Sequence, residues 1–310
     1  MLYLRKLPRC GQFKALFTVP IIVMAALLAS CQPSAQGKYS GYLYFIQSPY
    51  LMRFSLRDFG LEAVTTLGNT KIREISDFGE DRLLIAETAS INRKRVARIS
   101  WIDLETGRTQ ALYPGVQARY IASAGVMVYD DGNRLYAIAQ AEGTETTTQV
   151  LSHKRHQLSA MLEVSNGRLL IEVVEDGLPA IHAYRAEDGT LTRLDALSGT
   201  CSLKGAVWLD DLEQLACKER ADGETSSLGG YVLADLDGQV LSRPTFPEGD
   251  TFLALTYIRG QGALVLNETW TSPIDGLENS AVWVHDVQSG ENIELSDTLD
   301  LGSSVVYSAR

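Results

Sequence analysis

Two cysteines are the residues of this chain whose type and spacing most directly suggest chemistry. Cys201 and Cys217 flank a predicted hairpin whose turn lies near residues 210–211. A plain register about that turn pairs Cys217 with Lys204 and leaves Cys201 three residues out of step. A disulfide between them therefore needs a bulge or a longer loop, and two free thiols are the alternative. The chain has no Cys-x-x-Cys, so the spacing supports neither a redox motif nor a zinc site.

The N-terminal segment has the order of a secretory signal. Its basic residues end at Lys14 with no acidic residue among them, and an apolar run follows over residues 15–28. This run of 14 residues is shorter than the roughly 20 that a membrane-spanning helix needs. We therefore expect an exported protein in an oxidising compartment, where disulfides persist.

The end of this leader resembles the lipobox of bacterial lipoproteins. Residues 28–31 read Leu-Ala-Ser-Cys, so small residues stand directly before a cysteine. In that family the cysteine thiol receives a diacylglycerol and the chain is cut before it. The resemblance implies cleavage between Ser30 and Cys31, and a lipid on Cys31 that binds the protein to a bilayer. An ordinary cleaved signal with an incidental cysteine, or a retained anchor helix, is the alternative.

The same resemblance divides the chain and suggests its location. Residues 1–30 are a cleaved lipoprotein signal peptide, residues 31–40 a short polar tether, and residues 41–310 one domain, because no linker interrupts them. The lipoprotein family marks inner-membrane retention with an aspartate after the cysteine, and Gln32 stands there instead. This implies anchoring to the bacterial outer membrane, with the domain facing the periplasm.

The mature chain is acidic. Removal of residues 1–30 takes away four basic residues and no acidic one, so the formal charge changes from −10 to −14. Such a balance argues against nucleic acid, or a bare anionic membrane surface, as the main partner.

Short apolar runs recur about every 44 residues along the mature chain. They begin at residues 43, 83, 127, 169, 215 and 264. A second element follows, an Asp-x-x-x-Gly turn, at Asp103–Gly107 and again at Asp286–Gly290. The glycine provides the positive φ that a tight hairpin needs. The spacing indicates four strands in each repeat.

Repeats of this length with four strands each are typical of β-propellers, and the layout resembles WD40-like repeats and the propeller of the Tol-Pal system. The Gly-His and Trp-Asp dipeptides of WD40 blades are absent, so the resemblance carries the architecture alone. We predict an all-β fold, a six-bladed β-propeller of four-stranded blades. The first repeat has three strands, and the strand predicted at residues 303–308 is left over, so we predict that the C-terminal strand closes the ring. A pair of β-sandwiches is the alternative, but sandwiches do not repeat at a fixed period.

Five acidic or amide side chains follow the apolar runs, and they are Glu87, Asp130, Glu172, Glu219 and Asn267. Some six-bladed propellers are lactonases or related hydrolases, which gather carboxylates and asparagines around a metal at the channel, and that resemblance makes these residues candidates. Charged residues at strand ends are also what water-facing loop entrances require. The chain has no nucleophile elbow, phosphate loop or His-Glu-x-x-His, and His153 and His156 are expected in a solvated loop. We therefore predict no catalytic residue, metal or cofactor, with a metal-dependent, lactonase-like hydrolase as the alternative function.

Longer connections are predicted on one face of the ring, at residues 88–96, 113–119, 152–157, 218–229, 244–249 and 269–280. Their charges are sorted, with basic residues in blades two and three and acidic residues in blades five and six. A face of two signs would orient an approaching partner, and chance scatter is the alternative. The predicted partner-binding residues are Arg93, Lys94, Arg95, Arg119, Lys154, Arg155 and Trp270, the last at the opening of a loop.

These observations together predict a lipid-anchored propeller of the cell envelope that acts as a protein-binding or assembly scaffold, with an envelope protein as its partner. A carbohydrate- or peptidoglycan-binding lipoprotein is a further possibility, and it would present exposed aromatic side chains along a groove.

Overall fold

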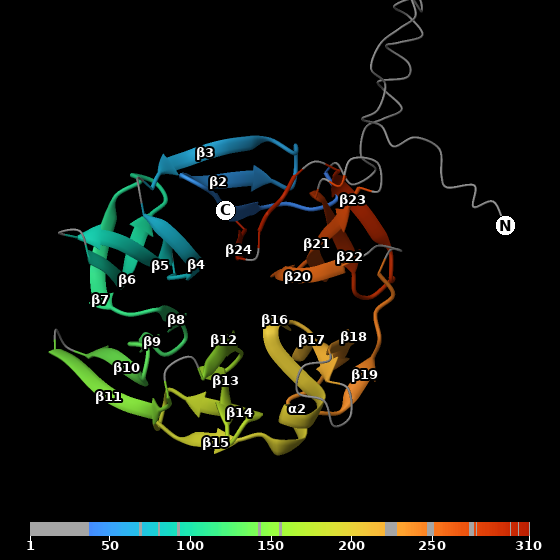
Figure 1. The fold of residues 1–310 in the computed structure, drawn as a ribbon. Coiled ribbons are helices and arrows are strands. Elements are labelled where there is room, and N and C mark those ends of the chain that lie inside the picture. The colour runs from blue at the N-terminus through green and yellow to red at the C-terminus, as the bar shows by residue number, and fades with distance from the viewer. Residues whose placement is uncertain are drawn as a thin grey trace, which may run out of the picture.

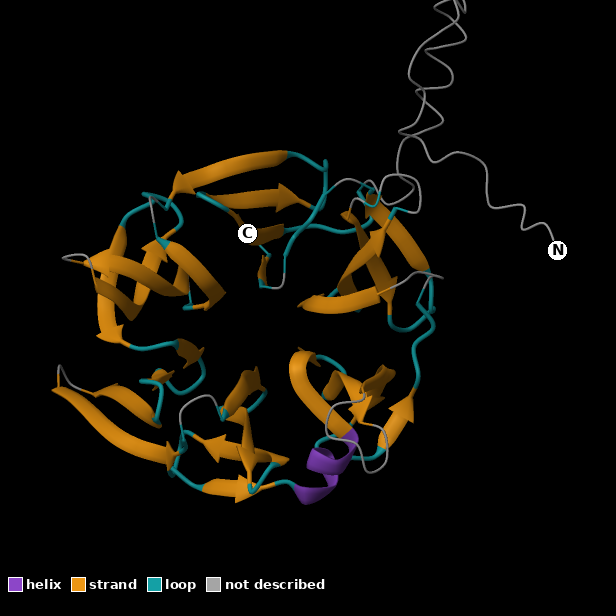
Figure 2. Cartoon of the chain, in the orientation of Figure 1, coloured by secondary structure: helices purple, strands orange, loops and turns teal. Residues whose placement is uncertain are grey.

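The computed structural model is a closed ring of six blades around a central channel, the β-propeller predicted from the sequence (Figure 1). It describes residues 37–67, 70–79, 81–91, 94–141, 144–154, 157–220, 228–246, 251–272, 276, 278–297, 299–302 and 304–309. Each blade is a sheet of four antiparallel strands, and almost all of the regular structure is strand (Figure 2). The described part of the chain contains one helix, α2 (Asp195–Thr200), between blades four and five.

The strands of each blade follow one another from the channel to the rim. The inner strands are β24 (Val305–Ser308), β4 (Lys71–Asp77), β8 (Gln117–Ile121), β12 (Leu158–Val164), β16 (Cys201–Leu209) and β20 (Thr251–Ile258). The second strands are β1 (Tyr42–Gln47), β5 (Arg82–Ile91), β9 (Val126–Asp130), β13 (Arg168–Glu175), β17 (Gln214–Arg220) and β21 (Ala263–Thr271). The third strands are β2 (Tyr50–Ser55), β6 (Lys94–Asp103), β10 (Arg134–Ala141), β14 (Leu178–Arg185), β18 (Leu228–Ala234) and β22 (Glu278–Asp286). The outer strands are β3 (Leu61–Thr66), β7 (Thr109–Pro114), β11 (Thr144–Ser152), β15 (Leu191–Arg193), β19 (Val240–Ser242) and β23 (Asn292–Ser296).

The ring is closed by the C-terminal strand, as predicted. Blade one has the order β24-β1-β2-β3, so a strand from the end of the chain occupies its innermost position. The antiparallel register pairs Tyr42 with Ser308 and Phe45 with Val305. Val305 and Val306 are buried, so this strand contributes core as well as hydrogen bonds.

The hydrophobic cores lie between blades. The second strands carry the apolar runs seen in the sequence, and their side chains alternate toward the two neighbouring blades. For example, Leu84 and Ala86 pack with blade three, whereas Leu83 and Ile85 pack with blade one. Six such clusters fill the six contacts between blades.

The strand order also defines two faces. Because strands alternate in direction, the turns after first and third strands lie on one face, which we name the short-turn face. Gly107 on that face has φ +67°, as the Asp-x-x-x-Gly pattern predicts. The connections after second and outer strands lie on the opposite face, which we name the mouth face.

Several of the predicted long connections are wrong in length. β5 runs to Ile91 and β6 starts at Lys94, so a regular hairpin occupies most of residues 88–96. β8 begins at Gln117, so Arg119 lies within an inner strand. The sequence of these strand ends predicts loops, because it lacks the apolar alternation of a half-buried strand, but hairpin pairing extends the strands through them.

Candidate functional site

The most prominent cavity is the central channel, with a volume of about 1630 Å³. Residues of all six inner strands line it, from Ser76 on β4 to Val306 on β24. Pockets at the centre of a rigid ring are positioned by many strands at once, which favours a preformed binding site.

The five acidic and amide residues considered for a hydrolase site do not converge on this channel. They lie on the second strands, and each contacts a neighbour in its own surroundings. Glu87 accepts hydrogen bonds from Arg98 Nε at 2.6 Å and Ser100 Oγ at 2.7 Å. Glu219 pairs with Arg243 at 2.6 Å, and the Asn267 amide donates to Asp300 at 3.2 Å. Among the residues that the structure describes, no group of three or more His, Cys, Asp or Glu side chains could hold a metal ion.

Asp130 is the member of this set that lines the channel, and a buried histidine holds it. Its Oδ1 lies 3.1 Å from His153 Nε2, and the two side chains are 4% and 3% exposed. Burial raises the pKa of Asp130, while the Gly132 N–H and His153 favour its charged form. The prediction that His153 stands in a solvated loop is wrong, because its side chain is buried against Asp130 at the end of β9, two strands away in the same blade, and sequence spacing does not reveal that contact. His156 lies outside the described residues.

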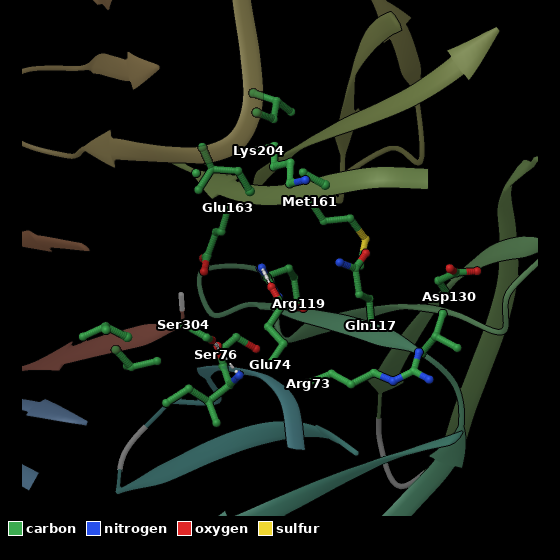
Figure 3. A pocket seen from close by; sticks show the side chains of 18 of the residues that line it. Arg73, Glu74, Ser76, Gln117, Arg119, Asp130, Met161, Glu163, Lys204 and Ser304 are labelled. Atoms are coloured by element: carbon green, nitrogen blue, oxygen red, sulfur yellow. Dashed lines mark hydrogen bonds and ion pairs between the residues drawn. The ribbon is translucent and has the colours of Figure 1, made fainter. Parts of the chain in front are cut away.

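Basic side chains line the half of the channel nearer the mouth face. They come from three blades: Lys71 and Arg73 on β4 and Arg95 on β6 of blade two, Arg119 on β8 of blade three, and Lys204 on β16 of blade five. Arg119 forms an ion pair with Glu74, and Arg73 Nε donates to Thr88 Oγ1 at 3.1 Å. The remaining three have no ion pair with any described residue. Figure 3 shows Lys204 and Arg119 entering the channel from different blades.

Lys204 stands on a bulge of β16. The pairing of β16 with β17 jumps from Ser202 to Val207, so residues 203–206 leave the ladder. Gly205 within the bulge has φ +73°, a conformation that favours glycine, and a Cβ there would displace the end of the Leu253 side chain, whose Cδ1 would lie 2.6 Å away. The register also differs from the plain one expected from sequence, because Val207 pairs with Ala216.

Buried polar groups support this bulge from behind. Glu172, 4% exposed, accepts a hydrogen bond of 2.6 Å from the Leu203 N–H, and Arg220 lies 3.1 Å from the same carboxylate. On the other side the Tyr231 hydroxyl donates to the Gly205 carbonyl at 3.0 Å and accepts from Ala254 N–H at 2.8 Å. Glu172 is therefore a support for the channel wall, not a ligand inside it.

A disulfide joins Cys201 to Cys217 at the start of the bulge. The Cα atoms are 5.6 Å apart and both side chains are fully buried. The sequence predicts that this bond needs a bulge or a longer loop, because a plain register leaves Cys201 three residues out of step. The bulge of β16 places Cys201 beside Cys217.

The end of the channel nearer the short-turn face is acidic. Asp77, Glu163 and Asp210 line it together with Arg259, whose Nε lies 2.7 Å from Asp210 Oδ2. Burial raises the pKa of Asp77, and burial with the nearby Asp77 and Asp210 charges raises the pKa of Glu163 to about 7. The channel thus has an excess of basic side chains over Glu74, Asp130 and Asp131 in its mouth half, and an excess of acidic side chains over Arg259 at its other end. The sequence pattern indicates Arg95 and Arg119 as binding residues but gives no signal for Lys71, Lys204 or the acidic end, because polar residues on inner strands look like ordinary strand termini.

The predicted partner-binding residues separate into groups. Arg95 and Arg119 line the channel, whereas Lys94 at the start of β6 and Lys154 after β11 do not. Trp270 lies within β21, opposite Asn279, and does not open a loop. Cys31, with the cleavage site after Ser30, and the residues Arg93 and Arg155 lie outside the described residues.

The ring and its channel are shared with solved structures of varied function. A chain of the nidogen/laminin complex is 12% identical with a TM-score of 0.59, covering 86% of this chain and 97% of that one. TolB from Acinetobacter baumannii is 12% identical with a TM-score of 0.58, covering 91% of this chain and 69% of that one. A puromycin-hydrolyzing peptidase of Mycobacterium tuberculosis is 14% identical with a TM-score of 0.55, covering 88% of this chain and 48% of that one.

These likenesses establish the class of protein, a six-bladed β-propeller, and bear out the predicted likeness to the Tol-Pal propeller at the level of architecture. This chain spans about half the length of the peptidase. No protein-family model matches the sequence, and no curated protein matches it either. Because the similar chains include a peptidase as well as TolB, the fold leaves open whether the protein is an enzyme.

Proposed function

We propose that this protein is a lipid-anchored propeller of the bacterial envelope that binds a protein partner on its mouth face. The observation that supports binding is the distribution of charge. The carboxylates that a channel hydrolase would use are engaged within the blades, whereas Lys71, Arg95 and Lys204 point into the channel without an ion pair to any described residue. A rigid ring with free cations at its opening suits recognition.

The proposed anchor also gives the ring an orientation. Residues 37–41 lie on the short-turn face, where Gly37 N–H donates to the Arg57 carbonyl and Lys38 pairs with Glu291 at 2.7 Å. Cys31 is six residues before Gly37, and an extended chain spans about 3.5 Å per residue, so the anchor lies within roughly 20 Å of this face. Lipid on Cys31 would therefore hold the short-turn face toward the outer membrane and the mouth face toward the periplasm. In the described part of the chain, no helix has the length and hydropathy to cross a membrane.

The anchor is tested by changing Cys31→Ala in the full chain. We expect this variant to keep an uncut leader and to lose incorporation of labelled palmitate, because the acylated thiol is gone. Cys10→Ala is the matched control, since it removes a cysteine from the leader without touching the lipobox. Normal processing and unchanged lipid labelling of Cys31→Ala would refute the lipoprotein proposal.

The binding face is tested by charge reversal and envelope crosslinking. Lys94→Glu with Arg95→Glu changes two exposed side chains at the start of β6, and Arg108→Glu is the control on the short-turn face. Association with a crosslinked partner should slow, and should become less salt-dependent, in the double variant alone. If both variants bind as the parent does, and a neutral substitution in the channel abolishes a hydrolytic activity, the lactonase-like alternative replaces the scaffold.

A further inference from the structure

We propose that the basic half of the channel binds an acidic, extended peptide segment, with Lys204 as its central contact. This inference rests on the proposed scaffold function and specifies what part of a partner the ring recognises. It is carried by the bulge of β16, by the charge along the channel and by the mixture of charged and apolar walls.

The bulge is built to place Lys204. A continuous strand would close blade five with more ladder hydrogen bonds, yet residues 203–206 leave the ladder and stand in the channel. Their position needs a glycine at 205, a buried Glu172 and the hydroxyl of Tyr231. Burying the Glu172 carboxylate is costly, even beside Arg220, and is a poor way to gain stability. Bulges next to binding sites commonly re-aim one side chain, and here that side chain is Lys204.

The charge along the channel places an anion in the same half. The chain has a net charge of −10, so a cluster of unpaired cations at one opening stands out against the whole molecule. At the other end Asp77, and Glu163 where it is ionised, repel an anion that travels further, whereas Asp210 is paired with Arg259. A low-dielectric channel with cations at its opening draws acidic ligands toward it and stops them beside Lys204 and Arg119.

The size and walls of the channel favour a peptide over a small anion. Its volume of about 1630 Å³ exceeds the roughly 300–1,000 Å³ of small-molecule pockets. β4 has seven residues and spans roughly 20 Å at about 3.3 Å per residue, so the basic half of the channel holds about three residues of an extended segment and the rest of the segment lies outside the mouth. Met161, Leu253 and Leu255 line the walls between the charges. Acidic side chains alternating with apolar ones match such walls, whereas an inorganic anion uses the cations alone.

The experiment uses the full-length protein in detergent and a fluorescein-labelled eight-residue peptide of alternating Glu and Leu. Lys replaces Glu in the control peptide. Fluorescence anisotropy should show saturable binding of the acidic peptide, weakened by salt, and no binding of the basic peptide. Lys204→Gln should weaken binding about tenfold and Lys71→Glu by a similar factor, because each removes a charge-assisted contact. Arg108→Glu on the short-turn face should leave binding unchanged, and thermal unfolding should verify that all three variants fold.

The outcomes separate this inference from the scaffold proposal. Equal binding of both peptides, parent-like binding by folded Lys204→Gln, or full displacement by sulfate at equal charge concentration would each overturn the inference. If a partner crosslinks at the mouth face and Lys204→Gln does not weaken it, the scaffold stands and the peptide site does not. If the acidic peptide binds through Lys204 and no envelope partner crosslinks, the site stands and the scaffold role is wrong.

Discussion

Removal of the disulfide between Cys201 and Cys217 should cost a measurable part of the stability of the ring. The bond closes a loop with a sequence separation of 16. In the chain-entropy description, a loop of that size restricts the unfolded state by about 3 kcal/mol. Both sulfurs are fully buried in a cluster with Leu203 and Trp208, so alanine at the two positions together loses about 1–2 kcal/mol more in packing. The variant Cys201→Ala with Cys217→Ala should therefore lose about 4–5 kcal/mol of unfolding free energy.

The assay is urea unfolding of the oxidised parent, the parent reduced while unfolded, and the double alanine variant. The reduced parent keeps both cysteine side chains and loses only the cross-link. Its free energy of unfolding should therefore fall by the chain-entropy contribution alone, about 3 kcal/mol. With about 2.1 cal/mol/K of unfolding entropy per residue over roughly 270 residues, that corresponds to a Tm lower by about 5 °C. A reduced parent within about 1 kcal/mol of the oxidised protein would refute the reasoning, because the bond would then restrain nothing that the sheet does not already restrain.

Two further results follow from the ring and its channel. Deletion of residues 304–310 should leave the β1 edge open and expose Phe45. The truncated protein should therefore aggregate or be cut by added protease. A truncated protein that unfolds at the same temperature as the parent would contradict closure of the ring by β24. Glu163 has a folded pKa raised from 4.5 to about 7, so its native form binds a proton more tightly than the unfolded chain, and the stability it contributes below pH 4.5 is lost as pH rises toward 7. Glu163→Gln should remove up to about 3 kcal/mol of that pH dependence. The check is the urea midpoint measured from pH 5 to pH 8. If the midpoint of the variant falls as steeply as that of the parent, the pH dependence does not come from Glu163.

The number of blades and the closure of the ring could be predicted from sequence because both depend on local pattern. The apolar runs that begin near Leu43 and Leu83 form second strands, which are buried on both sides and therefore carry the strongest signal. The strand containing Val306 had no partner in its own repeat, so topology assigned it to blade one.

The site could not be predicted to the same extent because it depends on which way inner strands face. Arg119 was expected on a loop, although it projects from β8 into the channel and pairs with Glu74 on another blade. From the sequence, Lys204 is only the residue that a plain register places opposite Cys217. The four-residue bulge that carries Lys204 into the channel has one indication in the sequence, Gly205. Contacts between blades join residues of different repeats, as between Glu74 and Arg119, which are 45 positions apart, and no spacing within one repeat reveals them.

The pairing of β24 with β1 also sets the order in which the protein can mature. These strands are separated by roughly 260 residues, so at roughly 5–20 residues per second β24 is made roughly 13–50 s after β1. Throughout that interval β1 has an unsatisfied edge, and the flank of blade one that packs on blade six has nothing to cover it. A chain interrupted anywhere before residue 305 keeps that edge indefinitely, which makes it a substrate for chaperones and proteases. The exposed edge of β1 is therefore paired only in chains that have been synthesised through β24.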